Sequence, residues 1–291
     1  MPEISIIIPC YNVEKFINRC YESIKKQTFQ DYEIIFVDDE SKDNTLSILK
    51  EIEKNDLKVK VISQKNKRQG GARNTGLNHA LGNYISYIDS DDYISEDFLF
   101  GLYEAIKEFD CDISMTGVIR HKAPDKFRDM IKFEKKEVYT DTVQKAKVNN
   151  GNGTGRSIWN KLYKKEFLIK NDLKFRENVS YEDCDFCAKA IYLADKIVTT
   201  NVGNYFYFVN QNSTMRNNLS DKKQKDKYLG LKMMIQFELE KGIITGYERI
   251  IKHDYSFFGL NFLRIKEKMS LDEIVEEWWL FDLVKIFQRK A

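Results

Sequence analysis

The sequence has no marked excess of either charge and no long apolar run. Its 291 residues include 47 lysines and arginines against 45 aspartates and glutamates, a net charge of +2. Such a balance argues against nucleic acid as the main partner. No apolar segment approaches the roughly 20 residues that span a bilayer. The N-terminus enters an apolar run without the basic segment and cleavage site of a signal peptide, so we expect a cytoplasmic protein.

Cysteine and histidine are also scarce. Five cysteines, an odd number without secretory context, are typical of a reducing cytoplasm. Cys184 and Cys187 form a C-x-x-C pair, but no second pair or nearby histidine completes a zinc site. Helical apolar spacing around them predicts buried helix cysteines. The three histidines, His79, His121 and His253, match no catalytic triad or metal-site spacing.

The common phosphate-binding loops are missing. Neither G-x-x-x-x-G-K-[ST] nor G-x-G-x-x-G occurs, which argues against a P-loop ATPase and a dinucleotide-dependent dehydrogenase. Gly70 and Gly71 instead open a predicted helix, where free backbone N–H groups and the helix dipole favour anions. Arg73 is therefore a candidate diphosphate or ribose contact. The alternative is a solvated helix arginine.

Strand-like and helical patterns alternate over the first 120 residues. Strands are predicted over 3–9, 33–38, 58–63, 83–89 and 112–119, and helices over 13–27, 43–54, 70–81 and 95–108. This alternation predicts a Rossmann-like, mainly parallel α/β sheet with helices on both faces. Ligands bind such sheets at the carboxyl ends of the strands.

The pattern changes after residue 120. Residues 121–137 are polar and basic, which predicts a surface excursion or an acceptor-side loop, and 149–155 form a turn-rich loop. A helix over 181–195 and strands over 196–201 and 204–209 follow. Residues 220–291 are predicted to be entirely helical. The last helix, 271–290, could lie in a membrane interface, but acidic residues dilute its basic face, which favours packing or dimerisation.

Two of the predicted strands end in aspartates. Asp38 and Asp39 follow one apolar run, and Asp89, Asp91 and Asp92 follow another. Crowded carboxylates repel each other, which raises their pKa unless a cation lies between them. Hard divalent cations take oxygen ligands and bridge carboxylates to phosphates. A metal-assisted nucleotide site at the carboxyl edge of the sheet is therefore predicted.

Four motifs, residues 5–12, 37–45, 66–76 and 89–92, occur in order and at suitable spacing. Together they resemble the family 2 glycosyltransferases, which have the GT-A fold. The resemblance is specific over residues 3 to about 120, weaker over 157–216 and absent beyond. It implies a GT-A domain over 1–215, with a nucleotide-binding half of about 1–120 and an acceptor half of about 121–215. A C-terminal helical region, 216–291, would follow.

The resemblance also implies a donor site. In it, Tyr11 would stack on the base and Asp39 would accept the uracil imide N–H. Asp91 would bind Mn²⁺ or Mg²⁺ directly, with Asp89 nearer the ribose. The implied nucleotide-sugar contacts are Pro9, Tyr11, Asn12, Asp39, Arg73, Asp89, Ser90 and Asp91. The alternatives are a core aromatic for Tyr11, helix caps for Asp38 or Asp39, and a capping turn that fits Asp92 or Ser95 better than the metal pair.

On the acceptor side, the resemblance makes Asp183 the base and Glu182 its neighbour or an acceptor contact. The alternative is an ordinary acidic first turn of a helix. Trp159 and Lys161 fall in a segment similar to the one that flanks the family's acceptor site, although Trp159 also suits a core. Many members have an arginine directly after an aromatic strand. Phe208 and Val209 stand there in this chain, so Arg216 or Ser213 would contact the diphosphate.

The implied activity is metal-dependent, inverting transfer of a sugar from a UDP-sugar to a hydroxyl of a glycan or lipid-linked acceptor. Bacterial capsule, exopolysaccharide or another surface glycan would be the product, made at the cytoplasmic membrane face. Two alternatives stay open. A nucleotidyltransferase usually has a glycine-rich, lysine-containing loop near its first strand, which this chain lacks. A catalytically silent glycan- or nucleotide-binding module would not need Asp89, Asp91 and Asp183.

Overall fold

The computed structural model describes residues 1–123, 125–142, 144–145, 148, 157–209, 221–242, 244–253, 263–268 and 284–288. The chain forms two compact units, Met1–Ser220 and Asp221–Ala291. The predicted turn-rich loop, 149–155, lies outside the described residues, as do Ser213 and Arg216. Among the helices that the structure describes, none has the length and apolar character needed to cross a bilayer.

The first unit alternates strands and helices, as predicted. Its strands are β1 (Ile4–Cys10), β2 (Tyr32–Asp38), β3 (Val59–Ser63), β4 (Tyr84–Tyr87), β5 (Tyr93–Ile94), β6 (Ile113–Ala123), β7 (Lys126–Ile131), β8 (Glu137–Tyr139), β9 (Lys161–Lys164) and β10 (Ile197–Phe208). Its helices include α1 (Ile17–Lys25), α2 (Thr45–Asn55), α3 (Arg68–His79), α4 (Phe98–Phe109), α6 (Lys165–Lys170) and α7 (Asp183–Leu193).

One mixed sheet unites these strands in the order β3-β2-β1-β4-β9-β6-β10-β5, with β7 beside β6 and β8 beside β10. The first four strands are parallel neighbours, so the predicted parallel core is confirmed. β9 lies antiparallel between β4 and β6, at a place where no strand was predicted. Because it reverses direction, β6 and β10 again run parallel to the first four strands.

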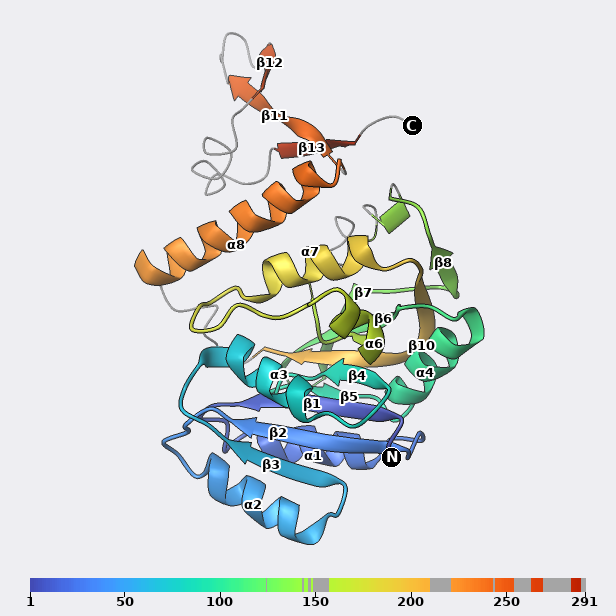
Figure 1. Cartoon of the computed structure of the whole chain (residues 1–291), viewed down its shortest axis with the longest axis vertical. Coiled ribbons are helices and arrows are strands. Elements are labelled where there is room, and N and C mark those ends of the chain that lie inside the picture. Colours follow the sequence, from blue (N-terminus) through green and yellow to red (C-terminus); the bar gives the residue numbers. More distant parts are fainter. Residues whose placement is uncertain are drawn as a thin grey trace. The chain divides into compact units, whose positions relative to one another are not determined.

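Helices cover both faces of the sheet, as the alternation predicts (Figure 1). Alternate residues of β1 point to opposite faces: Ile6 and Ile8 pack with α1, α2 and α4, whereas Ile7 packs with α3, α6 and α7. The central strands are therefore buried on both sides and consist of nearly continuous apolar residues. This double core fixes the carboxyl ends of β1, β2 and β4 at one edge of the sheet.

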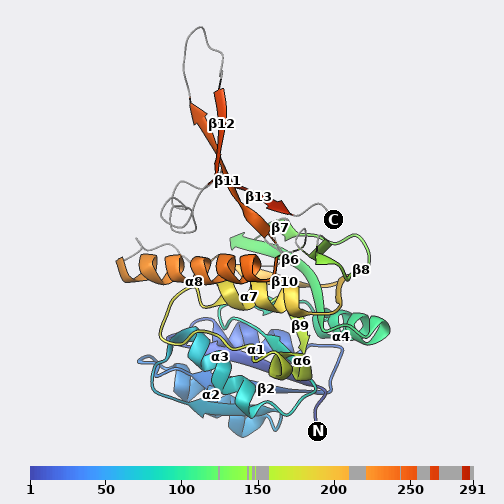
Figure 2. The same ribbon diagram turned by 45° about the horizontal axis from the view of Figure 1, so that its top comes forward.

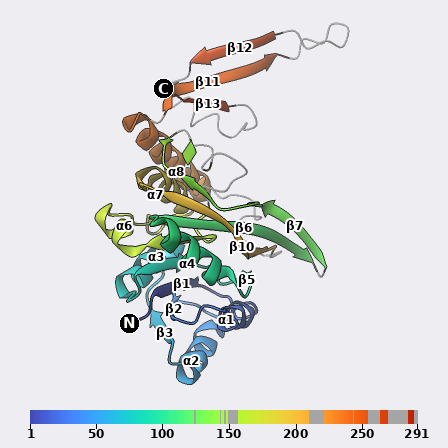
Figure 3. The ribbon, with the colours of Figure 1, turned by 90° about the vertical axis from the view of Figure 1, so that its right-hand side faces the viewer.

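The region after residue 120 is more ordered than predicted. Residues 121–137 do lie at the surface, but β6 and β7 form an antiparallel hairpin there, with β7 on the outside (Figure 3). The two strands predicted over 196–209 are one long strand, β10, whose pairing with β6 shifts between Thr199 and Asn204. Gly203, at φ +78°, lies in this irregular stretch and permits the bulge.

The prediction that residues 220–291 are entirely helical is wrong over three segments. Helix α8 (Asp221–Glu240) is present, but β11 (Ile244–His253), β12 (Leu263–Lys268) and β13 (Val284–Gln288) form an antiparallel sheet (Figure 2). Leu263 and Ile265 alternate with charged residues in β12, and such a period of two favours a strand. Within the predicted helix 271–290, the described residues form strand β13; the rest of that range lies outside the described residues.

Candidate active site

Asp39 follows β2 and is buried at the start of α3. Its Oδ1 accepts hydrogen bonds from Gln64 Nε2 at 2.7 Å and from the Lys67 backbone N–H at 2.9 Å. The anion at this helix start is thus the protein's own carboxylate. No hydrogen bond from the described residues reaches Asp39 Oδ2. This oxygen remains able to accept a ligand's N–H.

Tyr11 and Asn12 form the turn after β1, beside Asp39. Tyr11 is 48% exposed, as a ring that stacks on a base must be, and it is not a core aromatic. Asn12 has φ +54°, and its Oδ1 accepts a hydrogen bond from Lys42 N at 2.7 Å. Pro9 is buried within β1. A backbone hydrogen bond from Asp39 N to Cys10 O connects the ends of β1 and β2.

Arg73 is neither exposed nor directed to solvent. It is 2% exposed, and its Nη2 donates to Asp89 Oδ1 at 2.8 Å while its Nη1 donates to Glu182 Oε1. Its Nε has no hydrogen-bond partner among the described residues. Arg73 therefore joins the aspartates that follow β4 to the acidic pair at the start of α7.

Asp89 and Asp91 follow β4 at the same edge of the sheet. Both are partly exposed, and only Oδ1 of Asp89 is used by Arg73. The negative charges of Asp91 and Asp89 help to raise the pKa of buried Asp92, after the larger effect of burial. Excess acidic charge and oxygen donors fit a hard divalent cation that also binds phosphates and water. No cluster of three or more His, Cys, Asp or Glu side chains suited to a metal occurs in the described residues. Ser90, between the two aspartates, is buried.

Asp92 has a structural partner that the sequence did not reveal. Its carboxylate accepts hydrogen bonds from the Tyr205 hydroxyl at 2.6 Å and from Phe208 N at 2.7 Å. The Tyr205 hydroxyl in turn accepts from Asp89 N at 3.2 Å. Asp92 does not cap α4, because Asp97 occupies that position. It anchors β10 to the turn of residues 89–92, called the aspartate turn below. The two contacting residues are more than 100 positions apart, and the only sequence signal for their contact is the alternation of aromatic residues in β10.

Asp183 begins α7 next to Glu182. Glu182 is buried against Arg73, whereas Asp183 is partly exposed and forms no ion pair with any described residue. Burial and the Glu182 charge raise the pKa of Asp183 to about 6, against the opposing effect of Arg73. A partly exposed carboxylate with this pKa can accept a proton near neutral pH.

The start of α7 is held against α3 by several contacts. Arg68 Nη1 donates to Ser180 Oγ at 2.8 Å, and Asn178 N donates to Lys67 O at 2.9 Å. A Cβ on Gly70 would lie 2.1 Å from Arg176 O, so only glycine permits this approach. Gly70 therefore serves packing against the base-bearing segment rather than an open anion site.

The predicted acceptor residues lie in different settings. Trp159 stacks on Tyr205, with ring centroids 4.3 Å apart, and continues to Tyr207 at 6.1 Å. Lys161 is buried; its ammonium donates to Ser157 O and Asn160 Oδ1, and burial lowers its pKa to about 8. Trp159 therefore lies near the aspartate turn, because its partner Tyr205 hydrogen-bonds Asp92. The Lys161 ammonium, in contrast, is bonded to residues 157 and 160. Ser213 and Arg216 lie outside the described residues.

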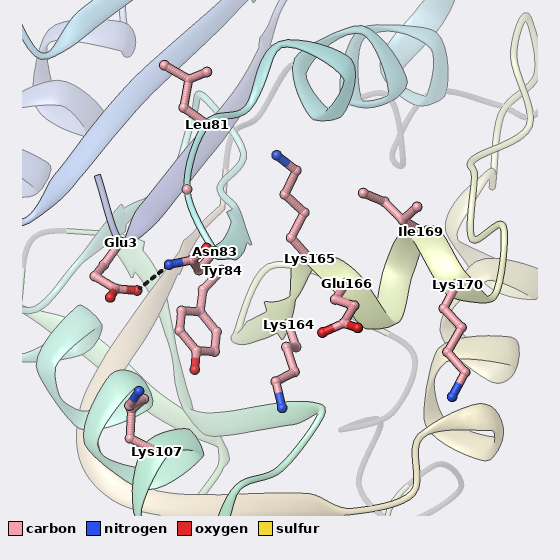
Figure 4. A pocket seen from close by; sticks show the side chains of 11 residues that line it. Glu3, Leu81, Asn83, Tyr84, Lys107, Lys164, Lys165, Glu166, Ile169 and Lys170 are labelled. Atoms are coloured by element: carbon pink, nitrogen blue, oxygen red, sulfur yellow. Dashed lines mark hydrogen bonds between the residues drawn. The ribbon is translucent and has the colours of Figure 1, made fainter. Parts of the chain in front are cut away.

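A cavity of about 560 Å³ lies at the opposite edge of the sheet, where β1 and β4 begin (Figure 4). Two of its lysines are already bonded: Lys164 pairs with Asp110 at 2.9 Å, and Lys165 Nζ donates to Ala80 O at 2.6 Å. None of the predicted site residues lines this cavity. The candidate site is therefore the carboxyl edge with Asp39, Asp89, Asp91 and Asp183.

Comparison with known proteins finds bacterial glycosyltransferases. The uncharacterized glycosyltransferase EpsJ of Bacillus subtilis (strain 168) is 32% identical over 216 residues, which are 73% of this chain and 63% of that protein. TarS of Staphylococcus aureus, a poly(ribitol-phosphate) β-N-acetylglucosaminyltransferase, is 31% identical over 214 residues, 71% of this chain and 35% of that protein. A crystal structure of S. aureus TarS 1-349 in complex with UDP-GlcNAc matches with a TM-score of 0.69 and 26% identity over 81% of this chain and 66% of that one.

This chain thus spans less than two thirds of the length of EpsJ and of TarS. The mixed sheet with helices on both faces is the GT-A fold of the TarS structure. Residues 5–171, more than half of the chain, match the family described as Glycosyl transferase family 2. The chain belongs to glycosyl transferase family 2.

Proposed function

We propose that this chain transfers a sugar, with inversion, from a UDP-sugar to a hydroxyl of a glycan or lipid-linked acceptor during cell-surface polymer synthesis. The observation that supports this most is the buried Arg73, which joins Asp89 on the donor side to Glu182, the neighbour of Asp183. One side chain thereby ties the nucleotide edge to the candidate base. The complex of TarS with UDP-GlcNAc supports a UDP-sugar as the donor.

Each residue has a defined part in this proposal. Tyr11 stacks on the uracil, and Asp39 Oδ2 accepts its imide N–H. Asp183 takes the proton from the acceptor hydroxyl, whose oxygen bonds to the anomeric carbon as the bond to UDP breaks. No covalent intermediate forms on the protein. The transferase would occupy residues 1–215, with 216–291 as a separate region.

Asp91 and Asp89 would hold a Mn²⁺ or Mg²⁺ ion. When bound, such an ion neutralises negative charge on the departing diphosphate. Asp89 Oδ2, which receives no hydrogen bond from the described residues, supports this assignment. Asp91→Ala should then weaken UDP binding in Mn²⁺, while UDP binding measured in EDTA should change little. Equal affinity in Mn²⁺ for both proteins would contradict the metal assignment.

Incubation with UDP-GlcNAc, UDP-Glc, UDP-Gal and UDP-GalNAc in Mn²⁺ tests the activity. A glycosyltransferase should release UDP slowly even without acceptor, because water can replace the hydroxyl. A nucleotidyltransferase would release pyrophosphate from a nucleoside triphosphate instead, and a silent binding module would release neither product. UDP binding without UDP release would indicate the silent binding module and contradict the proposed function, and absence of UDP binding would overturn it as well.

A further inference from the structure

A line of one tyrosine and two arginines leads away from the candidate site across β10, β6 and β7. Tyr207 of β10 is in register with Arg120 of β6, and Arg120 is directly opposite Arg128 of β7. Residues in register on neighbouring strands project from the same face, and the strands are about 4.8 Å apart. Tyr207, Arg120 and Arg128 therefore form one line on one face of the sheet.

The arginine pair is unfavourable as it stands. Like charges directly opposite each other destabilise an antiparallel ladder. Neither Arg120 nor Arg128 forms an ion pair with any described residue, and Arg120 Nε is buried without a hydrogen-bond partner. Lys126, two residues before Arg128 on the same strand, adds a third cation to this face. The chain thus maintains a repulsive cluster that a bound anion would neutralise.

The cluster adjoins the candidate active site. Burial raises the pKa of Tyr207, and the charges of Asp92 and Asp91 raise it further, whereas that of Arg120 lowers it. Tyr207 lies in β10 between Tyr205 and Phe208, which both hydrogen-bond Asp92, and it is in register with Arg120. It therefore lies between the aspartate turn and the arginines. Trp159, whose ring is stacked nearly parallel to that of Tyr207 at 13°, extends the aromatic surface. An aromatic surface suits a sugar, and the arginines suit a phosphate about one strand spacing further out.

We propose that Arg120 and Arg128 form an acceptor subsite that binds a phosphate group attached to the acceptor sugar. Guanidinium groups bind phosphate through paired, charge-assisted hydrogen bonds, and two adjacent guanidiniums match its several oxygens. The phosphate could belong to a phosphodiester polymer or to a lipid diphosphate, since both present the same group. This inference rests on the proposed function, because it identifies the chemistry of that enzyme's acceptor.

Binding of two probes to the protein saturated with UDP tests the subsite. The probes are a poly(glycerol phosphate) octamer and farnesyl diphosphate, and saturating UDP prevents either from occupying the donor site. Arg128→Gln should weaken binding of at least one probe about tenfold, and Arg120→Gln/Arg128→Gln should weaken it further. The probe that binds more tightly to the native protein identifies the source of the phosphate.

The matched control is Lys132→Gln/Lys135→Gln, in the same segment. These lysines already pair with Glu134 at 3.0 Å and Glu137 at 3.4 Å, so their loss should change affinity less than twofold. Equal losses in the control and in Arg120→Gln/Arg128→Gln would mean diffuse charge attraction and would overturn the subsite. Unchanged affinity of Arg128→Gln for both probes would do the same.

Thermal melting separates a ligand role from a structural one. Because Arg128→Gln removes a like-charge pair, the melting temperature without ligand should stay the same or rise. A clear fall, with probe affinity retained, would show that Arg128 supports the fold and would overturn the proposal. UDP affinity measured on every variant tests the proposed function separately. Absence of UDP binding by the native protein would refute that function, whereas the effect of the variants on probe binding would still test the subsite.

Discussion

The donor side and the base side of the candidate site are held in different ways. Asp39 is fixed by residues close in sequence, since Gln64 and Lys67 lie 25 and 28 positions away. The segment before Asp183 is fixed by α3 across much longer separations, 112 positions for Arg68 to Ser180 and 109 for Arg73 to Glu182. The donor pocket is thus formed by segments near one another in the sequence, whereas the candidate base comes from a segment more than 100 positions away from the helix that holds it.

Because of this difference, substitutions on the two sides should have different effects on donor binding, stability and catalysis. Changes near Asp39 should alter donor binding and leave the rest of the unit intact. Changes at Arg73 should affect both sides, because its guanidinium is the buried cation that Asp89 and Glu182 share. Changes at Asp183 should lower the rate of transfer without changing stability or donor binding, because its carboxylate forms no ion pair among the described residues.

The largest expected effect is at Asp183. Asp183→Asn keeps the size of the side chain but removes the proton acceptor, so transfer should fall by about 10²–10⁴-fold. The UDP dissociation constant, measured by calorimetry, should change less than about twofold. Transfer at the native rate would exclude Asp183 as the base, and the distinction between a donor side and a base side would then be wrong.

Arg73 should show the next largest effect. Arg73→Gln leaves two carboxylates near an uncharged amide in a buried place, which should lower the free energy of unfolding by about 3–5 kcal/mol. Urea denaturation followed by circular dichroism measures this change.

Arg73→Lys is the matched control for that variant. It keeps the charge but cannot donate in the planar, forked geometry that reaches both Asp89 and Glu182, so it should show an intermediate loss. If both variants are as stable as the native protein, Arg73 does not couple the two sides.

The same contrast explains what the sequence could predict. The order of β1 to β4, and the aspartates that follow β2 and β4, could be predicted because apolar runs and their acidic ends are local patterns. The insertion of β9 between β4 and β6 could not, because nothing in four residues indicates which strands will be its neighbours. The Asp92–Tyr205 bond and the Arg73 bridge are likewise products of tertiary packing.

In the second unit, short alternating segments compete with helical composition. Lysine- and glutamate-rich sequence favours helix locally, and α8 follows that preference. β11, β12 and β13 instead gain their stability from pairing with each other, which propensity does not include. The helix prediction was therefore wrong over β11, β12 and β13, where short alternating segments pair with each other against the local preference for helix.

Asp39 offers a test confined to the donor side. Asp39→Asn should weaken UDP binding by about 10- to 100-fold, since a hydrogen bond to a charged group contributes about 1.5–3 kcal/mol. Glu40→Gln, an exposed change of the same charge in the same turn, should have little effect. If the two variants bind UDP equally, the uracil does not contact Asp39.

The pH dependence of the transfer rate tests the role of Asp183 and should give the smallest of the expected effects. The pKa of Asp183 is raised to about 6 by burial and by Glu182, so lowering the pH through 6 protonates the carboxylate. A protonated base cannot accept the acceptor's proton, so the rate must fall toward acid and level off above neutrality. One pH unit above this pKa about ten-elevenths of the molecules hold the active form, and one unit below only about one-eleventh do, so transfer at pH 5 should be about tenfold slower than at pH 7. UDP affinity measured at both pH values separates donor binding from the chemical step, and a flat profile between them would mean that a group other than Asp183 removes the proton.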